Sequence, residues 1–581
     1  MIMKRRNFLS TAAKLGLTPI VNPLNLKHLF NYSSDFKKHL SKDDIENDEV
    51  LYNGIRLPKM WPPRYMDPTS DEPMPVPYLK NPPEVIPIDI GRQLFVDDFL
   101  IHETNLQRTF HHPEKYSGNP VFKAETEEEL NKESVVYLGH GGVFYDNIEK
   151  IFKMYYTSGW RGGLALATSY DMINWNRPKG PFIENLLLLP GERWQGYELR
   201  TAGTDNCIWL DLEANNSKER IKFLTCWFHV PVDQRPAGFN HSLHTSFDGL
   251  NWSKAIPTGM AADYCSFFYN PFRKVWVFSI KQNRVRGRCR YYSEHRDFKN
   301  GADWSNAVYW TNSDKLDKPE PENNYPGAGE LPQLYSLNAV AYESIMIGMH
   351  YIHRGPNNQK CEIGQFPKLT DLEVGFSRDG FHWSRPDRTG FIIGSRFEGA
   401  WDRAYLHSTA GIFVVYKDQL VFPYTGYSGI GHDGKHGMYT GGSIGLAILR
   451  RDGFASMNTQ HNNGLLLTRL VRFKGEYLFV NVDCPDGELR VEILDDSNKI
   501  IKPFSGKNCL SISVNKTLKV VKWKNAENLR TLKDKPVRFR FYLTNGKLYA
   551  FWVSSDKKGI SNGYLGAGGP DYNFIKDTDG L

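Results

Sequence analysis

One short pattern recurs along the chain and limits its fold more than any other feature: a serine, an aspartate two residues later and a tryptophan four residues after that. It occurs at residues 169–175, 246–252 and 377–383, with weaker copies at 292–304 and 451–454. In two strong copies glycine follows the aspartate, which supplies the positive φ of a tight β-hairpin turn. Successive copies lie about 50–80 residues apart, as in repeated β-sheet units. The pattern predicts an all-β chain with five blades around an axis, a β-propeller.

The composition agrees with many short strands and turns, because the chain has 14 Trp, 30 Tyr and 34 Phe beside 50 Gly and 33 Pro. The net charge of +7 is not gathered into a basic run, which argues against a nucleic-acid partner and is compatible with an anionic substrate. The seven cysteines are scattered and include no Cys-x-x-Cys pair. We therefore expect neither a disulfide framework nor a zinc site, and interpret the cysteines as small buried apolar residues.

The first 25 residues are predicted to be an export signal. Lys4-Arg5-Arg6-Asn7-Phe8-Leu9 resembles a twin-arginine motif, with an ordinary secretory signal or a disordered basic tail as alternatives. No later apolar run approaches the roughly 18–20 residues of a membrane span. The prediction is an exported protein, periplasmic or secreted. Residues 26–89 form a linker and then a Pro-rich strap that lies over other structure, since proline cannot donate within a central strand.

Strand patterns divide the rest of the chain. We interpret residues 90–101 as a strand that enters the first blade or closes the ring. The five-bladed propeller occupies residues 90–460, and its side chains from different blades meet in a central funnel. The Trp pattern then stops, and the short turn-separated strands of residues 461–555 predict a β-sandwich. Residues 556–581 are predicted to be a tail.

The combination of a five-bladed propeller with these hairpins and a following β-sandwich resembles glycoside hydrolase families 32 and 43. Residues 91–101, 268–273 and 341–344 resemble exported family-32-like bacterial proteins, a wider group that is also similar to an oligosaccharide dehydratase acting on ulvan. The family motifs Trp-x-Asn-Asp-Pro and Glu-Cys are absent in a matching context. Hydrolysis and elimination therefore both stay open as the reaction.

Candidate site residues are the polar side chains near each predicted inner strand. Hydrolysis of a glycosidic bond needs two carboxylates, and Asp205, Asp263 and Glu343 would share the roles of base, stabiliser and acid. Elimination from a uronic acid needs a base, an acid and a cation, for which His140, Tyr264, His407 and Arg200 are the candidates. The glycines beside His140 would let a ligand approach it closely. The predicted substrate-binding residues are Arg200, Arg288, Arg403, Asp402 and Trp401.

Each candidate has a structural alternative: turn formation for Asp205 and Asp263, an arginine partner for Glu343, and core packing for the two histidines. The aspartates of the three strong repeats are interpreted as hairpin structure, because a turn already explains them.

Three functions follow. The leading prediction is an exported glycoside hydrolase that acts on the non-reducing end of anionic, ulvan-type oligosaccharides. The alternatives are a dehydratase or lyase that forms an unsaturated uronic acid, and a non-catalytic glycan-binding propeller. We expect an oligosaccharide partner, no nucleic acid, no cofactor and no catalytic metal, and leave a structural calcium open.

Overall fold

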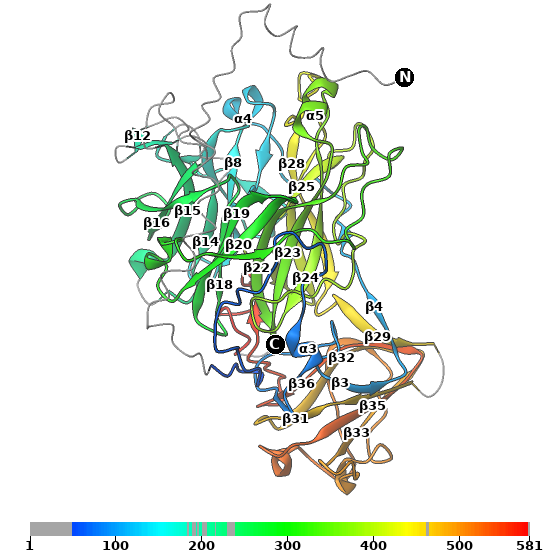
Figure 1. Cartoon of the computed structure of the whole chain (residues 1–581). Helices are drawn as coiled ribbons and strands as arrows, with labels where there is room; N and C mark the ends of the chain where they lie inside the picture. The colour runs from blue at the N-terminus through cyan, green and yellow to red at the C-terminus, as the bar shows by residue number, and fades with distance from the viewer. Residues whose placement is uncertain are drawn as a thin grey trace, which may run out of the picture. The chain divides into compact units, whose positions relative to one another are not determined.

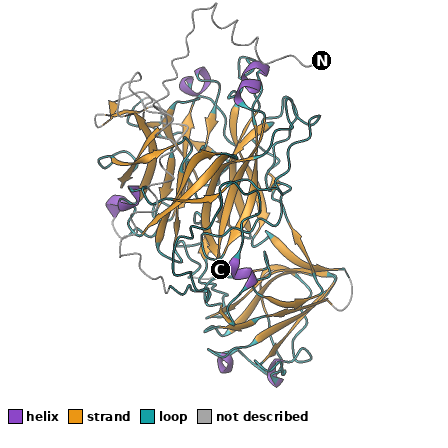
Figure 2. Ribbon diagram, in the orientation of Figure 1, coloured by secondary structure: helices purple, strands orange, loops and turns teal. Residues whose placement is uncertain are grey.

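The computed structural model describes residues 49–182, 185–188, 193–194, 197–199, 206–214, 217–228, 239–460 and 464–578. The chain divides into two units, residues 1–48 with 58–61 and residues 49–57 with 62–581, and every sheet belongs to the second unit. Strands dominate the described residues, and the α-helices are short: α3 (Pro77–Lys80), α4 (Glu127–Asn131) and α5 (Asn358–Gly364) (Figure 2). The prediction of an all-β chain is confirmed. The predicted export signal lies outside the described residues.

Five sheets follow one another along the described part of the chain. The first has β6 (Val136–Tyr137), β7 (Val143–Asp146), β8 (Ile151–Ser158), β9 (Gly163–Ser169), β10 (Trp175–Asn176) and β11 (Leu186–Leu188). The second has β12 (Arg193–Trp194), β13 (Tyr197–Leu199), β14 (Cys207–Leu210), β15 (Ile221–Phe228), β16 (Phe239–Ser246) and β17 (Ile256–Ala261). The third has β18 (Ser266–Asn270), β19 (Val275–Arg284), β20 (Gly287–His295) and β21 (Val308–Thr311).

The fourth sheet has β22 (Gln333–Glu343), β23 (Ile345–Gly355), β24 (Leu369–Ser377) and β37 (Tyr564–Leu565). The fifth has β25 (Ala404–His407), β26 (Val414–Tyr416), β27 (Gln419–Tyr427), β28 (Gly442–Arg450) and β5 (Glu114–Lys115). Because β37 pairs with β22, part of the predicted tail adds an edge strand to the fourth sheet.

The leading segments of these five sheets contact one another in a closed series. The contacts are the bridges Gly142–Ala410 and His140–Cys207 and the hydrogen bonds from Cys207 Sγ to Phe267 O, from Ser266 Oγ to Leu337 O and between the hydroxyls of Tyr335 and Tyr405. They join the fifth sheet to the first, the first to the second, and so on back to the fifth. Side chains far apart in the sequence therefore meet where the leading segments converge.

Two further sheets pack face to face. One has β34 (Asn515–Val520), β32 (Tyr477–Asp483), β36 (Gly546–Ser554), β29 (Ala455–Thr459), β4 (Gln107–Phe110) and β2 (Gln93–Leu94). The other has β3 (Ile101–Thr104), β30 (Gly464–Thr468), β35 (Arg538–Thr544) and β33 (Glu488–Leu494). Phe551 of the first contacts Phe541 and Phe539 of the second, with ring centroids 5.4 and 5.5 Å apart. β1 (Val85–Pro87) pairs separately with β31 (Leu470–Arg472).

The segment at residues 90–101 differs from its prediction. β2 pairs with β36 and β3 pairs with β30, so this segment joins the C-terminal sheets and does not enter the first blade (Figure 1). The periodicity of a strand does not reveal its partner, and here the partner lies far along the chain.

The repeated hairpins are turns closed by the aspartate, as predicted. Asp248 Oδ1 accepts the backbone N–H groups of Leu250 and Asn251, each at 2.8 Å. Asp171 and Asp379 make equivalent bonds. The turn is longer than the predicted tight hairpin turn, because Ser246 forms a β-bridge with Trp252. The fifth copy is different, since Asp452 is fully buried in an ion pair with Arg92.

All seven cysteines are buried and free, which confirms their predicted role in packing. No helix in the described part of the chain has the length and apolarity that a membrane crossing requires.

Candidate functional site

A hydrogen-bonded tyrosine–histidine pair lies where the leading segments converge. The Tyr264 hydroxyl and His407 Nδ1 are 3.0 Å apart, and both side chains are buried. Tyr264 precedes β18 with a φ of +66°, a conformation that costs a non-glycine residue free energy. The buried Arg290 holds this turn by donating to the Tyr264 carbonyl at 2.8 Å. The fold therefore fixes a strained residue in contact with a histidine from another sheet.

His140 joins the pair from the first sheet. Its ring centroid lies 4.4 Å from that of Tyr264, and its Nε2 is 3.1 Å from Ser336 Oγ. The structure gives the neighbouring glycine another role than the predicted ligand approach. A Cβ on Gly141 would lie 2.0 Å from the Tyr155 carbonyl oxygen, so glycine is needed there for packing against β8. We call His140, Tyr264, Tyr335, Tyr405 and His407 the Tyr264 cluster.

Three cations surround Tyr335 of this cluster. Lys281 Nζ, Arg288 Cζ and Lys368 Nζ lie 4.6, 5.4 and 5.5 Å from the centroid of its ring. We call them the cationic group. Tyr335 also lies 4.9 Å from the Tyr264 ring, so the cationic group adjoins the tyrosine–histidine pair.

Asp263 is the carboxylate that pairs with the cationic group in the described part of the chain, through Lys281 at 2.5 Å. Its side chain is 45% exposed and marks an edge of the site that reaches solvent. Burial alone would raise the pKa of Asp263, but Lys281, Lys368 and Arg288 outweigh it and lower the pKa to about 2. Asp263 is therefore ionised at neutral pH and is unable to serve as a general acid.

The two histidines are neutral, because burial and the neighbouring cations both disfavour their charged form. Burial, followed by Lys368, lowers the pKa of His407 to about 3. Burial lowers the pKa of His140 well below its usual value, with Arg290 and His407 adding to the effect. Burial raises the pKa of the Tyr264 hydroxyl well above 10. The resting site thus holds neutral imidazoles beside a neutral phenol.

Glu343 lies outside the Tyr264 cluster and the cationic group. Its carboxylate contacts Arg451 at 2.9 Å and Arg92 at 3.5 Å, and all three side chains are fully buried. Tyr335 and Glu343 are eight residues apart on β22, which corresponds to about 26 Å along an extended strand. This placement corrects the expectation that Glu343 shares a pocket with Asp263, and favours the arginine-partner alternative.

Three predicted substrate-binding residues also lie outside the Tyr264 cluster and the cationic group. Asp402 accepts from Lys115 Nζ of β5 at 2.6 Å, and Trp401 packs beside Tyr424 with centroids 5.3 Å apart. Arg403 lies 4.0 Å from Glu398 and over the ring of Tyr325. The reason is local: these residues come before β25, and only its later residues, Tyr405 and His407, enter the Tyr264 cluster.

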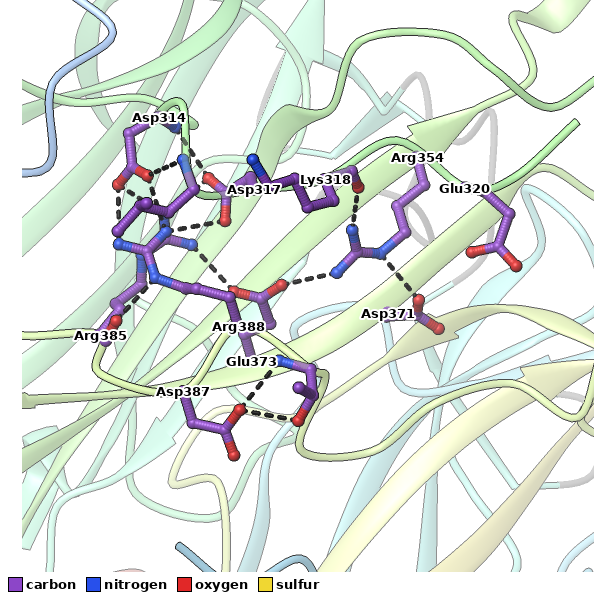
Figure 3. Close-up of polar contacts among 12 residues, drawn as sticks. Asp314, Asp317, Lys318, Glu320, Arg354, Asp371, Glu373, Arg385, Asp387 and Arg388 are labelled. Atoms are coloured by element: carbon purple, nitrogen blue, oxygen red, sulfur yellow. Dashed lines mark hydrogen bonds and ion pairs between the residues drawn. The ribbon is translucent and has the colours of Figure 1, made fainter.

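Arg396 N donates to the Arg403 carbonyl at 2.9 Å, and the Arg396 side chain binds Asp371, a member of a second set of charged residues around β23 and β24. Figure 3 shows this set, in which Arg385 binds Asp314, Asp317 and Glu373 at 3.1, 2.7 and 3.1 Å. Arg354 binds Glu373 and Asp371. Because each of these buried carboxylates pairs with an arginine, we assign the set to stability.

Asp205 and Arg200 lie outside the described residues, so their placement stays a prediction. Among the described residues, no group of three or more His, Cys, Asp or Glu is arranged to hold a metal ion. Sequence reasoning missed Lys281, Tyr335, Lys368 and Tyr405. Only Tyr405 could have been found from the sequence, because it stands two residues before the predicted His407, and residues at that spacing share a face of a regular strand.

No family model and no curated protein matches the chain. Similar solved structures include an N-acetylgalactosamine deacetylase from F. plautii, crystallised with blood group B trisaccharide (14% identity, 60% of this chain and 96% of that chain, TM-score 0.39). A thermostable family-43 glycoside hydrolase is also similar (12% identity, 56% of this chain and 94% of that chain, TM-score 0.36). A Bombyx mori family-32 β-fructofuranosidase is similar as well (10% identity, 75% of this chain and 94% of that chain, TM-score 0.34).

The resemblance to families 32 and 43 thus recurs among the similar structures, whereas likeness to the ulvan-acting group stays a prediction. These TM-scores are low, so we infer the function from the residues of this chain alone.

Proposed function

We propose that this chain is an exported carbohydrate-active enzyme that carries out an elimination on an anionic oligosaccharide, with Tyr264 and His407 as its acid–base pair. The observation that carries the proposal is the 3.0 Å contact between the Tyr264 hydroxyl and His407 Nδ1, beside a cationic group. We further propose that the five consecutive sheets form a five-bladed propeller, since their leading segments contact in a closed series, and that the two C-terminal sheets form a sandwich.

The proposed reaction uses the histidine tautomer in which Nδ1–H donates to the Tyr264 oxygen. His407 Nε2, which has no hydrogen-bond partner within the described residues, then takes the proton from the carbon next to the sugar carboxylate. The released electron pair forms a double bond to the next carbon, and the carbon–oxygen bond there breaks. The leaving oxygen takes the Tyr264 hydroxyl proton, and the imidazolium Nδ1–H restores the phenol.

Elimination fits these residues better than hydrolysis does. Hydrolysis needs one protonated and one ionised carboxyl group on opposite sides of the bond. Asp263 is ionised, and Glu343 lies eight residues from Tyr335 on β22, about 26 Å along an extended strand. Hydrolysis stays the second candidate, since Asp263 is suited to the ionised role and Asp205 would have to supply the proton.

The test is incubation with oligosaccharides that carry a uronic acid at the non-reducing end. Elimination predicts the ultraviolet absorbance of an unsaturated uronate, lost in Tyr264→Phe and retained in Tyr170→Phe. Tyr170 is a matched control, because it is 77% exposed and lies in a hairpin turn. Release of saturated sugar would favour hydrolysis. Tight binding without turnover of any uronic-acid substrate would favour a glycan-binding propeller and overturn the proposal.

A further inference from the structure

We propose that Lys368 and Arg288 form the subsite that binds the substrate carboxylate, and that its occupation makes His407 a stronger base. This inference rests on the proposed function and names the group that the site recognises. It also gives Lys368, which lies between α5 and β24, a positioning role in the reaction.

The surroundings of Lys368 are aromatic. Lys368 is 3% exposed, and its Nζ lies 4.7, 5.0 and 5.5 Å from the ring centroids of Tyr405, Tyr439 and Tyr335. Within the described residues its ammonium makes no hydrogen bond and no ion pair. Aromatic rings stabilise a cation only modestly, whereas an ammonium removed from water requires an anion or several acceptors. Lys368 is therefore a buried cation without an anionic partner among the described residues.

The charges around Tyr335 indicate the sign and the size of the missing group. When all three members are protonated, the cationic group carries three positive charges, and Asp263 pairs with Lys281. Two positive charges then remain, on Arg288 and, below about pH 7, on Lys368. Arg288 donates through Nη1 to Gln333 Oε1 at 2.9 Å, and its Nε and Nη2 make no hydrogen bond within the described residues. A guanidinium with two open donors matches a planar carboxylate.

Occupation of this subsite acts on His407 through charge. The Tyr405 ring contacts both groups, with its centroid 4.3 Å from that of His407 and 4.7 Å from Lys368 Nζ. After burial, Lys368 is the cause of the low pKa of His407. A carboxylate bound to Lys368 offsets that cation, so the pKa of His407 rises when substrate is present. The base is thereby activated by the ligand whose proton it removes.

The shared chemistry of possible ligands is an anionic group on a sugar ring, either a carboxylate or a sulfate ester. We commit to the carboxylate, because a carboxylate neutralised by cations acidifies the proton on the adjacent carbon, which elimination removes, and because Arg288 presents a planar fork. The experiment includes both anions.

Calorimetric titration with glucuronate, glucose 6-sulfate and glucose measures the subsite without turnover. The wild-type protein is expected to bind glucuronate at least about tenfold more tightly than either other sugar. Lys368→Met is expected to lose this preference and Lys435→Met to keep it, since the Lys435 side chain is 65% exposed. A preference retained in Lys368→Met, or a preference for the sulfate, overturns the inference.

A second measurement needs no variant at Lys368. Nuclear magnetic resonance of labelled histidine in the wild-type protein follows the His407 titration, assigned by comparison with His407→Gln. Glucuronate is expected to move this titration to higher pH, and glucose is expected to leave it unchanged. An unchanged titration with glucuronate bound would contradict the activation of His407. Carboxylate-specific binding with no elimination product would overturn the proposed function while upholding the subsite.

Discussion

Replacing Lys368 by methionine tests the charge balance of the site through stability. Methionine keeps the length of the side chain and removes the ammonium. Burial, then Arg288 and Lys281, lowers the pKa of Lys368 from 10.5 to about 7, although Asp263 and Cys361 act in the opposite direction. Tyr335, Tyr405 and Tyr439 face the same Nζ. The unfolded chain therefore holds the Lys368 proton more tightly than the folded protein does.

The sign and size of the effect follow from proton linkage. Below about pH 7 both states are protonated and the contribution of Lys368 is constant and unfavourable. As pH rises from about 7 toward 10.5 the folded state loses the proton first, so the free energy of unfolding rises. With the folded pKa near 7, the gain between pH 6 and pH 8 is about 1.4 kcal/mol.

Urea unfolding of wild type, Lys368→Met and Lys435→Met at pH 6 and pH 8, at constant ionic strength, measures this gain. The difference in free energy of unfolding between wild type and Lys368→Met is expected to change by about 1.4 kcal/mol in favour of wild type at the higher pH. The Lys435→Met difference is expected to stay constant. Equal Lys368→Met differences at both pH values would show that the folded protein does not lower the pKa of Lys368.

Three further predictions follow from the contacts of single residues. Tyr264→Phe keeps the ring packing, and we expect turnover to fall about 10²–10⁴-fold with the melting temperature nearly unchanged; full activity would exclude Tyr264 as the acid. Glu343→Gln leaves the buried guanidinium groups of Arg92 and Arg451 without its charge, and urea unfolding is expected to show a loss of about 3–5 kcal/mol, with turnover per folded molecule retained. Asp248→Ala removes the acceptor of two backbone N–H groups, and the free energy of unfolding is expected to fall by about 1–2 kcal/mol in the same assay. An unchanged free energy of unfolding would show that the Asp248 side chain does not stabilise the turn.

Local chemistry made part of the fold predictable. A serine and an aspartate two residues apart close a turn through hydrogen bonds within a few residues, as Asp248 does. The pairing of β2 with β36 was not predictable in this way, because a strand pattern at residues 90–101 suits any sheet with an open edge. Only the packed structure decides which edge that segment joins.

Some residues of the candidate site were likewise predictable from the local sequence and others were not. Tyr264 and His407 were predicted because each stands beside an expected inner strand, and they do meet. Glu343 was placed with them because it belongs to β22, but an eleven-residue strand has two ends and the pattern does not say which one faces the site. Lys368 was missed because nothing local distinguishes one buried lysine among 72 lysines and arginines.

The central claim is that the pair formed by Tyr264 and His407 removes a proton and breaks a carbon–oxygen bond without adding water. Mass spectrometry of products formed from uronic-acid oligosaccharides in water enriched with heavy oxygen tests it most directly. We expect an unsaturated uronate that carries no heavy oxygen. A saturated product that carries one heavy oxygen atom would establish hydrolysis and exclude elimination.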